Sequence, residues 1–304
     1  MARLLKKCVI ASGISIASFY CGIYYEKKTT SNETLFDKFK NLPGLPLYGT
    51  VSAATSFSPV PQSMNRTSQI MKYGFPSLDN VKSFSDYVLS YDRRTRVAHW
   101  VFEHLTKETV KYNDAVDRSL CNFMPDESIH HFFRAENSDY LRSGYDRGHL
   151  AAAGNHRCCQ KDVEQTFYLS NMAPQVGVGF NRDSWNRLEK YVRKLTKKYI
   201  NVYCCTGPLY LPRKEADGKN YVKYEVIGAN NVAVPTHFFK IVVAEMENGE
   251  LHMESYVMPN QVIDNNVALS NFQVPPEAIE RAAGLLFFDN VSRSKMKTIN
   301  GKKS

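Results

Sequence analysis

The sequence lacks two features that would have set its class at once. It has no internal repeat, which excludes a solenoid or a propeller built from short units. Its seven cysteines follow no regular spacing, so a disulfide framework is not the source of its stability. Four of them form the adjacent pairs Cys158–Cys159 and Cys204–Cys205, and neighbouring cysteines do not easily bridge each other. Free thiols in a reduced or weakly oxidising compartment are therefore expected.

The N-terminal segment lacks acidic residues. None precedes Glu26, whereas three basic residues stand before an apolar run from Cys8 to Tyr25. Such a segment allows three interpretations: a mitochondrial presequence with a membrane-sorting stretch, a secretory signal peptide, or a permanent anchor. Bulky residues around Tyr20 stand where a secretory signal needs small ones. This favours a mitochondrial targeting segment over residues 1–25, with membrane association before processing.

Three further regions follow from composition. Residues 26–67 are rich in proline, glycine and hydroxyl side chains, which is typical of a flexible linker. Residues 68–290 carry the alternating and periodic apolar patterns of one folded domain. Residues 291–304 hold five basic residues and no acidic one, and a frayed, solvated end is favoured there over a DNA-binding arm. The whole chain carries a net charge of +9, which favours nucleic acid or an anionic membrane as partner.

The folded region is expected to be mainly β-structure. Runs of aromatic and β-branched residues predict strands, and Asn248-Gly249 predicts a hairpin between the last two of them. The predicted strands cover residues 85–91, 97–105, 202–206, 221–227, 237–244 and 251–258. A helix over 275–283 begins at proline and ends before Gly284. Since hairpins dominate, the fold class is α+β, with a mostly antiparallel central sheet and packed helices.

One helix carries an unusual combination of residues. An apolar stripe with helical spacing runs from Trp185 to Tyr199, and the other faces of the segment 181–198 are strongly basic. A solvated basic face is the simplest interpretation. However, Asn181 stands at its start and Glu189 lies within the basic run. For an α-helix, eight residues give about 12 Å of rise and about 80° of rotation, so both side chains can serve one site.

The string Asp146-Arg147-Gly148-His149 contains the groups needed to cleave a phosphodiester. His149 titrates near neutrality and can accept the proton of an attacking water. Arg147 offers a permanently charged, planar fork that matches phosphate oxygens. Gly148 is expected to permit a turn that other residues adopt only with strain. The leaving oxygen then requires a Lewis acid or a metal-bound water.

Asn181 is the candidate metal ligand. A neutral amide binds a dication weakly, but Mg²⁺ keeps most of its waters and needs few protein ligands when a substrate phosphate completes its shell. Glu189 would then hold a metal-bound water, although a direct carboxylate ligand is the alternative. A structural zinc site made from His149, His156 and the Cys158–Cys159 pair is disfavoured because the spacing fits no common pattern.

These motifs resemble those of the DNA/RNA non-specific endonucleases of the ββα-metal type. The matching segments are YDRGHLAAAGNHR at 145–157, TFYLSNMAPQ at 166–175, FNRDSWNRLEKYVR at 180–193 and VYCCTGPLYLPRKEADGKNYVKYEVIG at 202–228. The resemblance covers about residues 68–290 and implies a ββα-metal catalytic motif within the α+β fold. Cys158–Cys159 departs from it, because relatives carry other residues there, which puts the local packing in question.

The resemblance also implies the roles of the site residues. His149 would be the general base, Asn181 the sole direct protein ligand of Mg²⁺ (or Mn²⁺), and Glu189 the residue that orients metal-bound water. Arg147, Asn171 and Arg193 would support the phosphate and the site.

The implied activity is cleavage of DNA and RNA without sequence preference, by a homodimer. The products would carry 5′-phosphate and 3′-hydroxyl ends. Mitochondrial members reside in the intermembrane space and reach the nucleus during cell death. Two alternatives stay open: a nucleic-acid-binding homologue without turnover, and a secreted scavenging nuclease.

Overall fold

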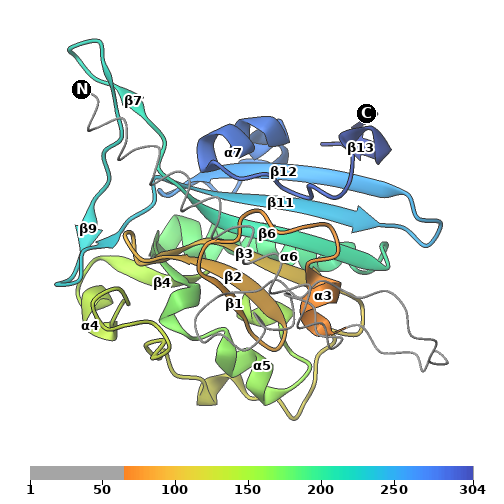
Figure 1. The fold of residues 1–304 in the computed structure, drawn as a ribbon, viewed down its shortest axis with the longest axis horizontal. Helices are drawn as coiled ribbons and strands as arrows, with labels where there is room; N and C mark the ends of the chain where they lie inside the picture. Colours follow the sequence, from red (N-terminus) through yellow and green to blue (C-terminus); the bar gives the residue numbers. More distant parts are fainter. Residues whose placement is uncertain (1–64, 304) are drawn as a thin grey trace, which may run out of the picture. The chain divides into compact units, whose positions relative to one another are not determined.

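The computed structural model describes residues 65–303, and the expectations for residues 1–25 and most of 26–67 lie outside them. An eight-stranded sheet organises this part of the chain (Figure 1). All neighbours pair antiparallel except one pair, β12 and β13. In spatial order the strands are β1 (Val81–Ser83), β2 (Tyr87–Asp92), β3 (Val97–Leu105), β6 (Asn201–Leu209), β11 (His237–Glu245), β12 (Leu251–Pro259), β13 (Met296–Ile299) and β14 (Lys302–Lys303). The predicted α+β class with a mostly antiparallel sheet is confirmed.

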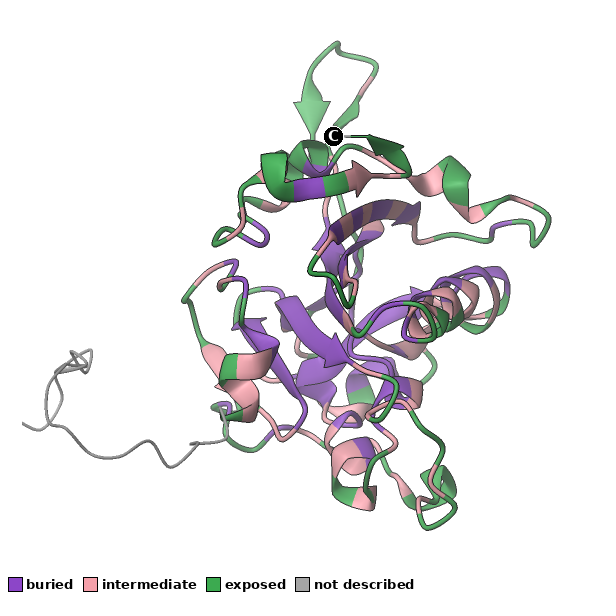
Figure 2. Cartoon of the chain, turned by 90° about the vertical axis from the view of Figure 1, so that its right-hand side faces the viewer, coloured by how far each residue is buried: buried purple, intermediate pink, exposed green. Residues whose placement is uncertain are grey.

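Both faces of this sheet are buried, and Figure 2 shows the central strands almost entirely so. Along β2, Tyr87 and Leu89 belong to one apolar cluster and Val88 to the other, as the two-residue period of a strand requires. The first cluster continues into helix α6 (Asn186–Leu195), and the second into α3 (Arg66–Ile70) and α7 (Pro276–Ala283). Because both faces are covered, the long strands read as continuous apolar runs.

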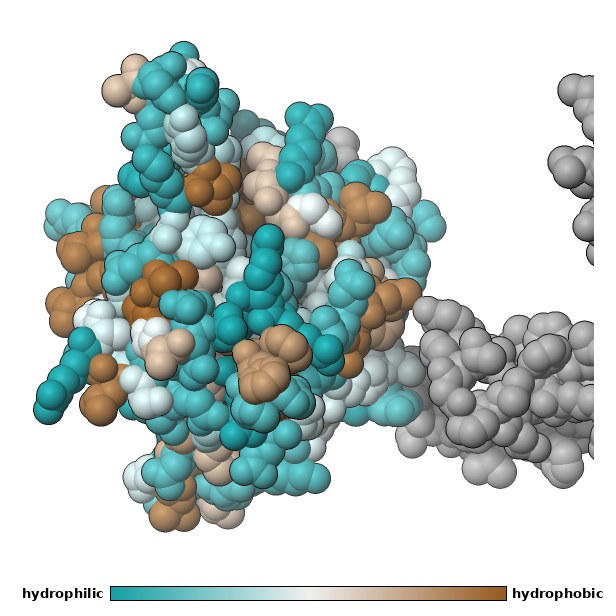
Figure 3. Space-filling model, turned by 60° about the vertical axis from the view of Figure 1, so that its left-hand side comes forward, coloured by the Kyte–Doolittle hydropathy of each residue, from teal (hydrophilic) through white to brown (hydrophobic). Residues whose placement is uncertain are grey.

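The long strands agree with the sequence predictions, but the strand predicted over 221–227 is wrong. That segment belongs to a projecting arm with only four two-residue strands: β7 (Arg213–Lys214), β8 (Asn220–Tyr221), β9 (Val226–Ile227) and β10 (Val232–Ala233). Its apolar residues Val222, Tyr224 and Val226 are exposed. In Figure 3 the projection at the top carries mostly hydrophilic side chains, with apolar ones near its base.

Both edges of the folded region differ from the composition-based expectation. Helix α3 begins at Arg66, inside the expected linker, and its Ile70 is fully buried. At the other end, β13 pairs in parallel with β12, and Met296 is only 2% exposed. The expected frayed end is therefore wrong for residues 291–303. A short strand can form without a long apolar run when one of its side chains is buried and the neighbouring strand, here β12, has an unpaired edge.

The site is carried by a second, two-stranded sheet followed by a helix. Strand β4 (Tyr145–His149) pairs antiparallel with β5 (Met172–Val176), which leads into η4 (Gly177–Trp185) and then α6. The short helices are η1 (Arg118–Leu120), α4 (Asn137–Tyr140), η2 (Ala153–Asn155), α5 (Gln160–Gln165), η3 (Leu169–Asn171), η5 (Leu269–Phe272) and η6 (Arg293–Lys295). Within residues 65–303 no helix is long and apolar enough to span a bilayer.

Candidate active site

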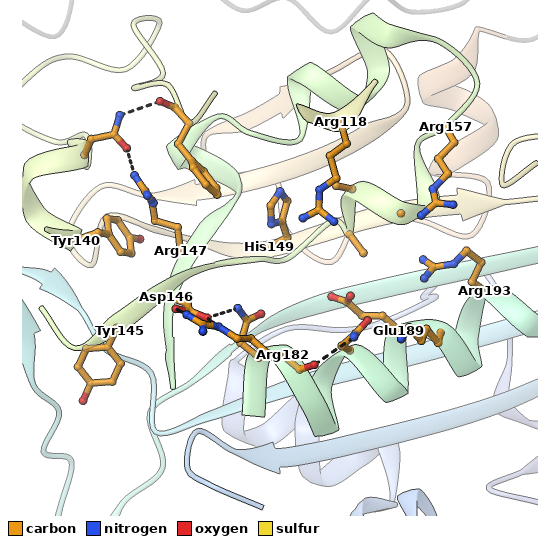
Figure 4. A pocket seen from close by; sticks show the side chains of 18 of the residues that line it. Arg118, Tyr140, Tyr145, Asp146, Arg147, His149, Arg157, Arg182, Glu189 and Arg193 are labelled. Carbon is orange, nitrogen blue, oxygen red and sulfur yellow. Dashed lines mark hydrogen bonds and ion pairs between the residues drawn. The ribbon is translucent and has the colours of Figure 1, made fainter. Parts of the chain in front are cut away.

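A polar groove of about 770 Å³ lies between the β4 strand and the helix that follows β5. Figure 4 shows basic side chains entering it from several elements, with His149 above Glu189. The residues used below that line it are Arg118, Phe123, Asn137, Asp146, Arg147, His149, Gly154, Arg157, Asn181, Arg182, Glu189 and Arg193. Five of the six predicted site residues are thus brought to one groove.

Strand β4 places Arg147 and His149 on the same side, since alternate residues of a strand share a face. The Arg147 guanidinium donates to Asn137 Oδ1 at 2.7 Å and lies 4.2 Å from the centre of the Phe123 ring. These two contacts hold the fork in the groove while leaving other N–H groups available for phosphate oxygens.

His149 lies among aromatic rings rather than polar groups. Its ring centre is 5.8 Å from that of Phe123 and 4.8 Å from that of Phe167. Neither imidazole nitrogen has a hydrogen-bond partner among the described residues, and Nε2 is buried. Burial, aided by the positive charge of Arg118, lowers the pKa of His149 to about 3. The imidazole is therefore neutral at pH 7, as a general base must be, but the expectation that it titrates near neutrality is wrong, because the sequence does not show its burial.

Gly148 does not serve the turn expected of it. It lies inside β4 without a positive φ, and a Cβ there would stand 2.1 Å from Gln175 Oε1. Gln175, on the paired strand β5, is fully buried. The glycine leaves room for the buried side chain of Gln175, so the expected reason was wrong.

Asn181 is oriented by a carboxylate that the sequence analysis left without a role. Its Nδ2 donates to Asp146 Oδ2 at 2.9 Å, which leaves Oδ1, the atom that can bind a cation, without a partner among the described residues. Two hydrogen bonds from Arg182, at 2.8 and 2.7 Å, hold the pKa of Asp146 below its usual range. Asp146 therefore stays ionised and keeps the amide in this orientation.

Glu189 faces the same groove from α6. The described residues provide its carboxylate with no hydrogen-bond partner, and burial raises its pKa to about 7. The α-helical rise and rotation expected between Asn181 and Glu189 do not apply. The segment η4 turns at Gly179 (φ +85°) and then continues as a wide π-helical stretch into α6. Such wide turns often occur at functional sites, and here both Asn181 and Glu189 line the groove.

This arrangement fits a hard divalent cation with few protein ligands. A fixed amide oxygen and an unpaired carboxylate face one groove, and both are ligand types that Mg²⁺ accepts. No group of three His, Cys, Asp or Glu residues within 65–303 is arranged to hold a metal. The disfavoured zinc site is not formed there.

Arg193 and Asn171 have different positions. Arg193 lines the groove and donates through Nη1 to Asn155 Oδ1. Asn171 is fully buried and bonds only backbone groups: Oδ1 accepts from Ala151 N at 2.9 Å, and Nδ2 donates to the carbonyls of Ala151 and Thr166 at 3.0 and 2.8 Å. Asn171 does not line the groove, so its part in the predicted support of the phosphate and the site is indirect. It braces the chain just after His149.

Two guanidiniums in the groove were missed by the sequence analysis. Arg118 lies over the Phe167 ring at 5.7 Å and Arg157 over the Tyr112 ring at 5.8 Å, and no hydrogen bond to either side chain is formed within the described part. Their positions relative to His149 depend on folding, so no local motif indicated them. The Cys158–Cys159 pair follows Arg157, and all five cysteines of the described region are free thiols.

The fold and the groove together define a phosphodiesterase of known type. The model of the DNA/RNA non-specific endonuclease family matches residues 66–294, so the chain belongs to this family and is a nuclease that hydrolyses phosphodiester bonds.

Individual relatives agree with this assignment. The mitochondrial endonuclease G of Caenorhabditis elegans is 48% identical over 99% of this chain and 98% of its own length. The mitochondrial endonuclease G of Homo sapiens is 56% identical, over 73% and 74%. A solved structure described as a crystal structure of the EndoG/EndoGI complex is 70% identical, with a TM-score of 0.78, and covers 81% of this chain and 99% of its own.

Proposed function

We propose that this nuclease is Mg²⁺-dependent, with Mn²⁺ as an alternative metal, and cleaves DNA and RNA regardless of sugar and sequence to leave 5′-phosphate and 3′-hydroxyl ends. The observation that carries the proposal is the pairing of Asn181 with Asp146 opposite an unpartnered His149. In this arrangement one amide oxygen and one neutral imidazole face the same groove.

Each residue then has a defined task. His149 accepts the proton of the attacking water, and its low pKa keeps it free to do so. Arg147 binds non-bridging phosphate oxygens, while Arg193 and Arg118 add positive charge for the transition state. Asn181 would hold the cation directly and Glu189 would hold one of its waters. A bound Mg²⁺ would supply charge and Lewis acidity for the leaving oxygen.

Lack of base selectivity follows from the same groove. Six arginines line it, and their guanidiniums can bind phosphate oxygens, which carry no sequence information. The net charge of +9 supports the same mode of binding.

Location and assembly are proposed from the relatives. The full-length match to a protein named mitochondrial includes the N-terminal segment, which supports a mitochondrial location. We extend this to the intermembrane space, with relocation to the nucleus in cell death, and to a homodimer as the active form.

A plasmid-nicking assay on the full chain tests the metal role. Cutting with Mg²⁺ should stop in EDTA and return when Mg²⁺ is restored. Asn181→Ala should remain nearly inactive at any Mg²⁺ concentration, because it removes the direct ligand, whereas the matched control Asn248→Ala, in the exposed turn between β11 and β12 and outside the groove, should cut. Cutting that persists in chelator would overturn the proposed mechanism.

A further inference from the structure

A row of hydrogen-bonded polar groups leads from the first described helix to the groove. We call it the charged relay. Its members, in order of contact, are Arg66, Asp86, His156, Glu103, Asn155 and Arg193. Only the last enters the mechanism above, and the first was expected to be linker.

His156 is the centre of the relay. It is fully buried, with Nδ1 2.7 Å from Asp86 Oδ2 and Nε2 3.0 Å from Glu103 Oε1. Carboxylates accept but do not donate, so both ring nitrogens must carry protons and the ring is an imidazolium. Burial alone would lower its pKa, but the two carboxylates raise it to about 9. The other charged groups near Glu103 are Lys240, Glu189 and Arg193.

The orientation of Asn155 follows from its hydrogen bond to Glu103. Asn155 is 2% exposed and donates through Nδ2 to Glu103 Oε1 at 2.8 Å. Its amide oxygen must then point the other way, where it accepts from Arg193 Nη1. Gly154 completes the support, because a Cβ there would stand 2.8 Å from the same nitrogen. The relay therefore determines where one arm of the Arg193 guanidinium lies in the groove.

Arg66 fixes the far end. Its Nε donates to Asp86 Oδ1 at 2.7 Å, and Nη2 donates to the His104 carbonyl at 2.7 Å. Nη1 lies 2.8 Å from His104 Nδ1. Burial would raise the pKa of Asp86, but His156 and Arg66 lower it overall. The positive charge of Arg66 thus compensates the negative charge of Asp86. Without Arg66, Asp86 and Glu103 would both depend on the single positive charge of His156.

We propose that Arg66 is a positioning residue for the nuclease reaction and that it acts on Arg193 through the charged relay. Helix α3 is then part of the catalytic apparatus rather than the end of a linker. A cut that frees the enzyme from its N-terminal segment must fall before Arg66 to give full activity. The inference rests on the proposed nuclease mechanism, in which Arg193 supports the phosphate.

A double-mutant cycle on the full chain tests this. Arg66→Ala should lower kcat on plasmid DNA about tenfold, as supporting residues near a site typically do. In an Arg193→Ala background the same change should cost less than about twofold, since residues of one network are not additive. Arg66→Lys, which keeps the charge but loses the fork, should show a smaller loss with the same dependence on Arg193.

Lys297→Ala is the matched control. It breaks a surface ion pair of 3.2 Å to Glu250 that has no hydrogen bond to a member of the charged relay, so kcat should not change. Thermal melts establish that each variant is folded, and Arg66→Lys carries the test if Arg66→Ala is not. Equal losses with and without Arg193, or unchanged kcat in a folded Arg66→Ala protein, would overturn the inference. An inactive wild type would instead contradict the proposed function on which it rests.

Discussion

Two histidines seven residues apart are in opposite electrostatic states in two neighbouring regions. In the groove, His149 has aromatic neighbours and no hydrogen-bond partner among the described residues, and its pKa falls to about 3. In the charged relay, His156 lies between two carboxylates, and its pKa rises to about 9. Burial lowers the pKa of both rings, so burial alone does not decide the state of a titratable group. The available partners decide it.

The difference separates two tasks. In the proposed mechanism, the group that takes a proton from substrate water is kept unpaired, and the group that holds its neighbours is kept charged and bonded on both sides. Glu189 belongs with His149, because it too lacks a partner and its pKa is raised by burial. If the two environments were exchanged, His149 would already be protonated and could not accept a proton. His156 would be neutral, and the charged relay would lose its central charge.

The largest effect that this comparison predicts is on the rate. His149→Ala removes the unpaired base, so activity should fall by about 10²–10⁴. Stability should change little, because no hydrogen bond of the described structure is lost. Single-turnover cleavage of plasmid DNA, alongside a thermal melt, measures both, with His237→Ala as control. Activity within a few-fold of wild type would show that another group is the base.

The second effect is on stability against pH. The raised pKa of His156 contributes stability that is fully present below pH 6.5 and is lost as pH rises through about 9. A rise from 6.5 to about 9 corresponds to roughly 3 kcal/mol. The lowered pKa of His149 acts in the opposite window, where stability is lost as pH falls below 6.5.

Denaturant unfolding between pH 6 and 10 tests the alkaline part. Wild type should lose stability across this range, whereas His156→Gln should be less stable at pH 6 and much less dependent on pH. A parallel decline in both proteins would mean that another group is responsible.

The smallest of the three effects concerns Glu189. With a pKa of about 7 in the metal-free protein, its carboxylate is protonated at lower pH, so apparent Mg²⁺ affinity should decrease as pH falls below about 7. Glu189→Gln should weaken that affinity about 10–100-fold, remove this pH dependence and recover activity at high Mg²⁺. A Mg²⁺ titration of activity at several pH values measures all three. A variant that no Mg²⁺ concentration rescues would make Glu189 a direct ligand.

The sequence predicted the long strands and the main chemical groups well. Strand β3 was expected over 97–105 and spans those residues, because Val97, Trp100, Val101 and Phe102 are residue types that favour a buried strand. The arm misled the prediction, since Val222 and Tyr224 form a strand-like pattern but have no long strand beside them. Helix α3 and strand β13 were missed because each contains a single buried residue, Ile70 or Met296, and therefore shows no apolar period.

In the site, residues within one motif were identified, while contacts between distant segments were not. His149 and Arg147 follow from the chemistry of four consecutive residues. The reason for Gly148 depends on Gln175, which lies 27 positions away and becomes a neighbour only when β4 and β5 pair. The charged relay has the same character, because no spacing of residues in the chain connects Asp86 and Glu103 with His156.

The wide turn of η4 limits how the length of this chain can change. Between Gly179 and α6 the chain makes wider turns than an α-helix does. Such π-helical turns contain more residues per turn, as a helix does where a residue has been inserted. A deletion there would let an ordinary α-helix form and would rotate Asn181 by about 100° relative to Glu189. The amide would turn away from Asp146, and the protein would fold without a place for its cation. Insertions in the exposed arm around Gly218 face no such restriction, since nothing lies within 4 Å of a Cβ at that position.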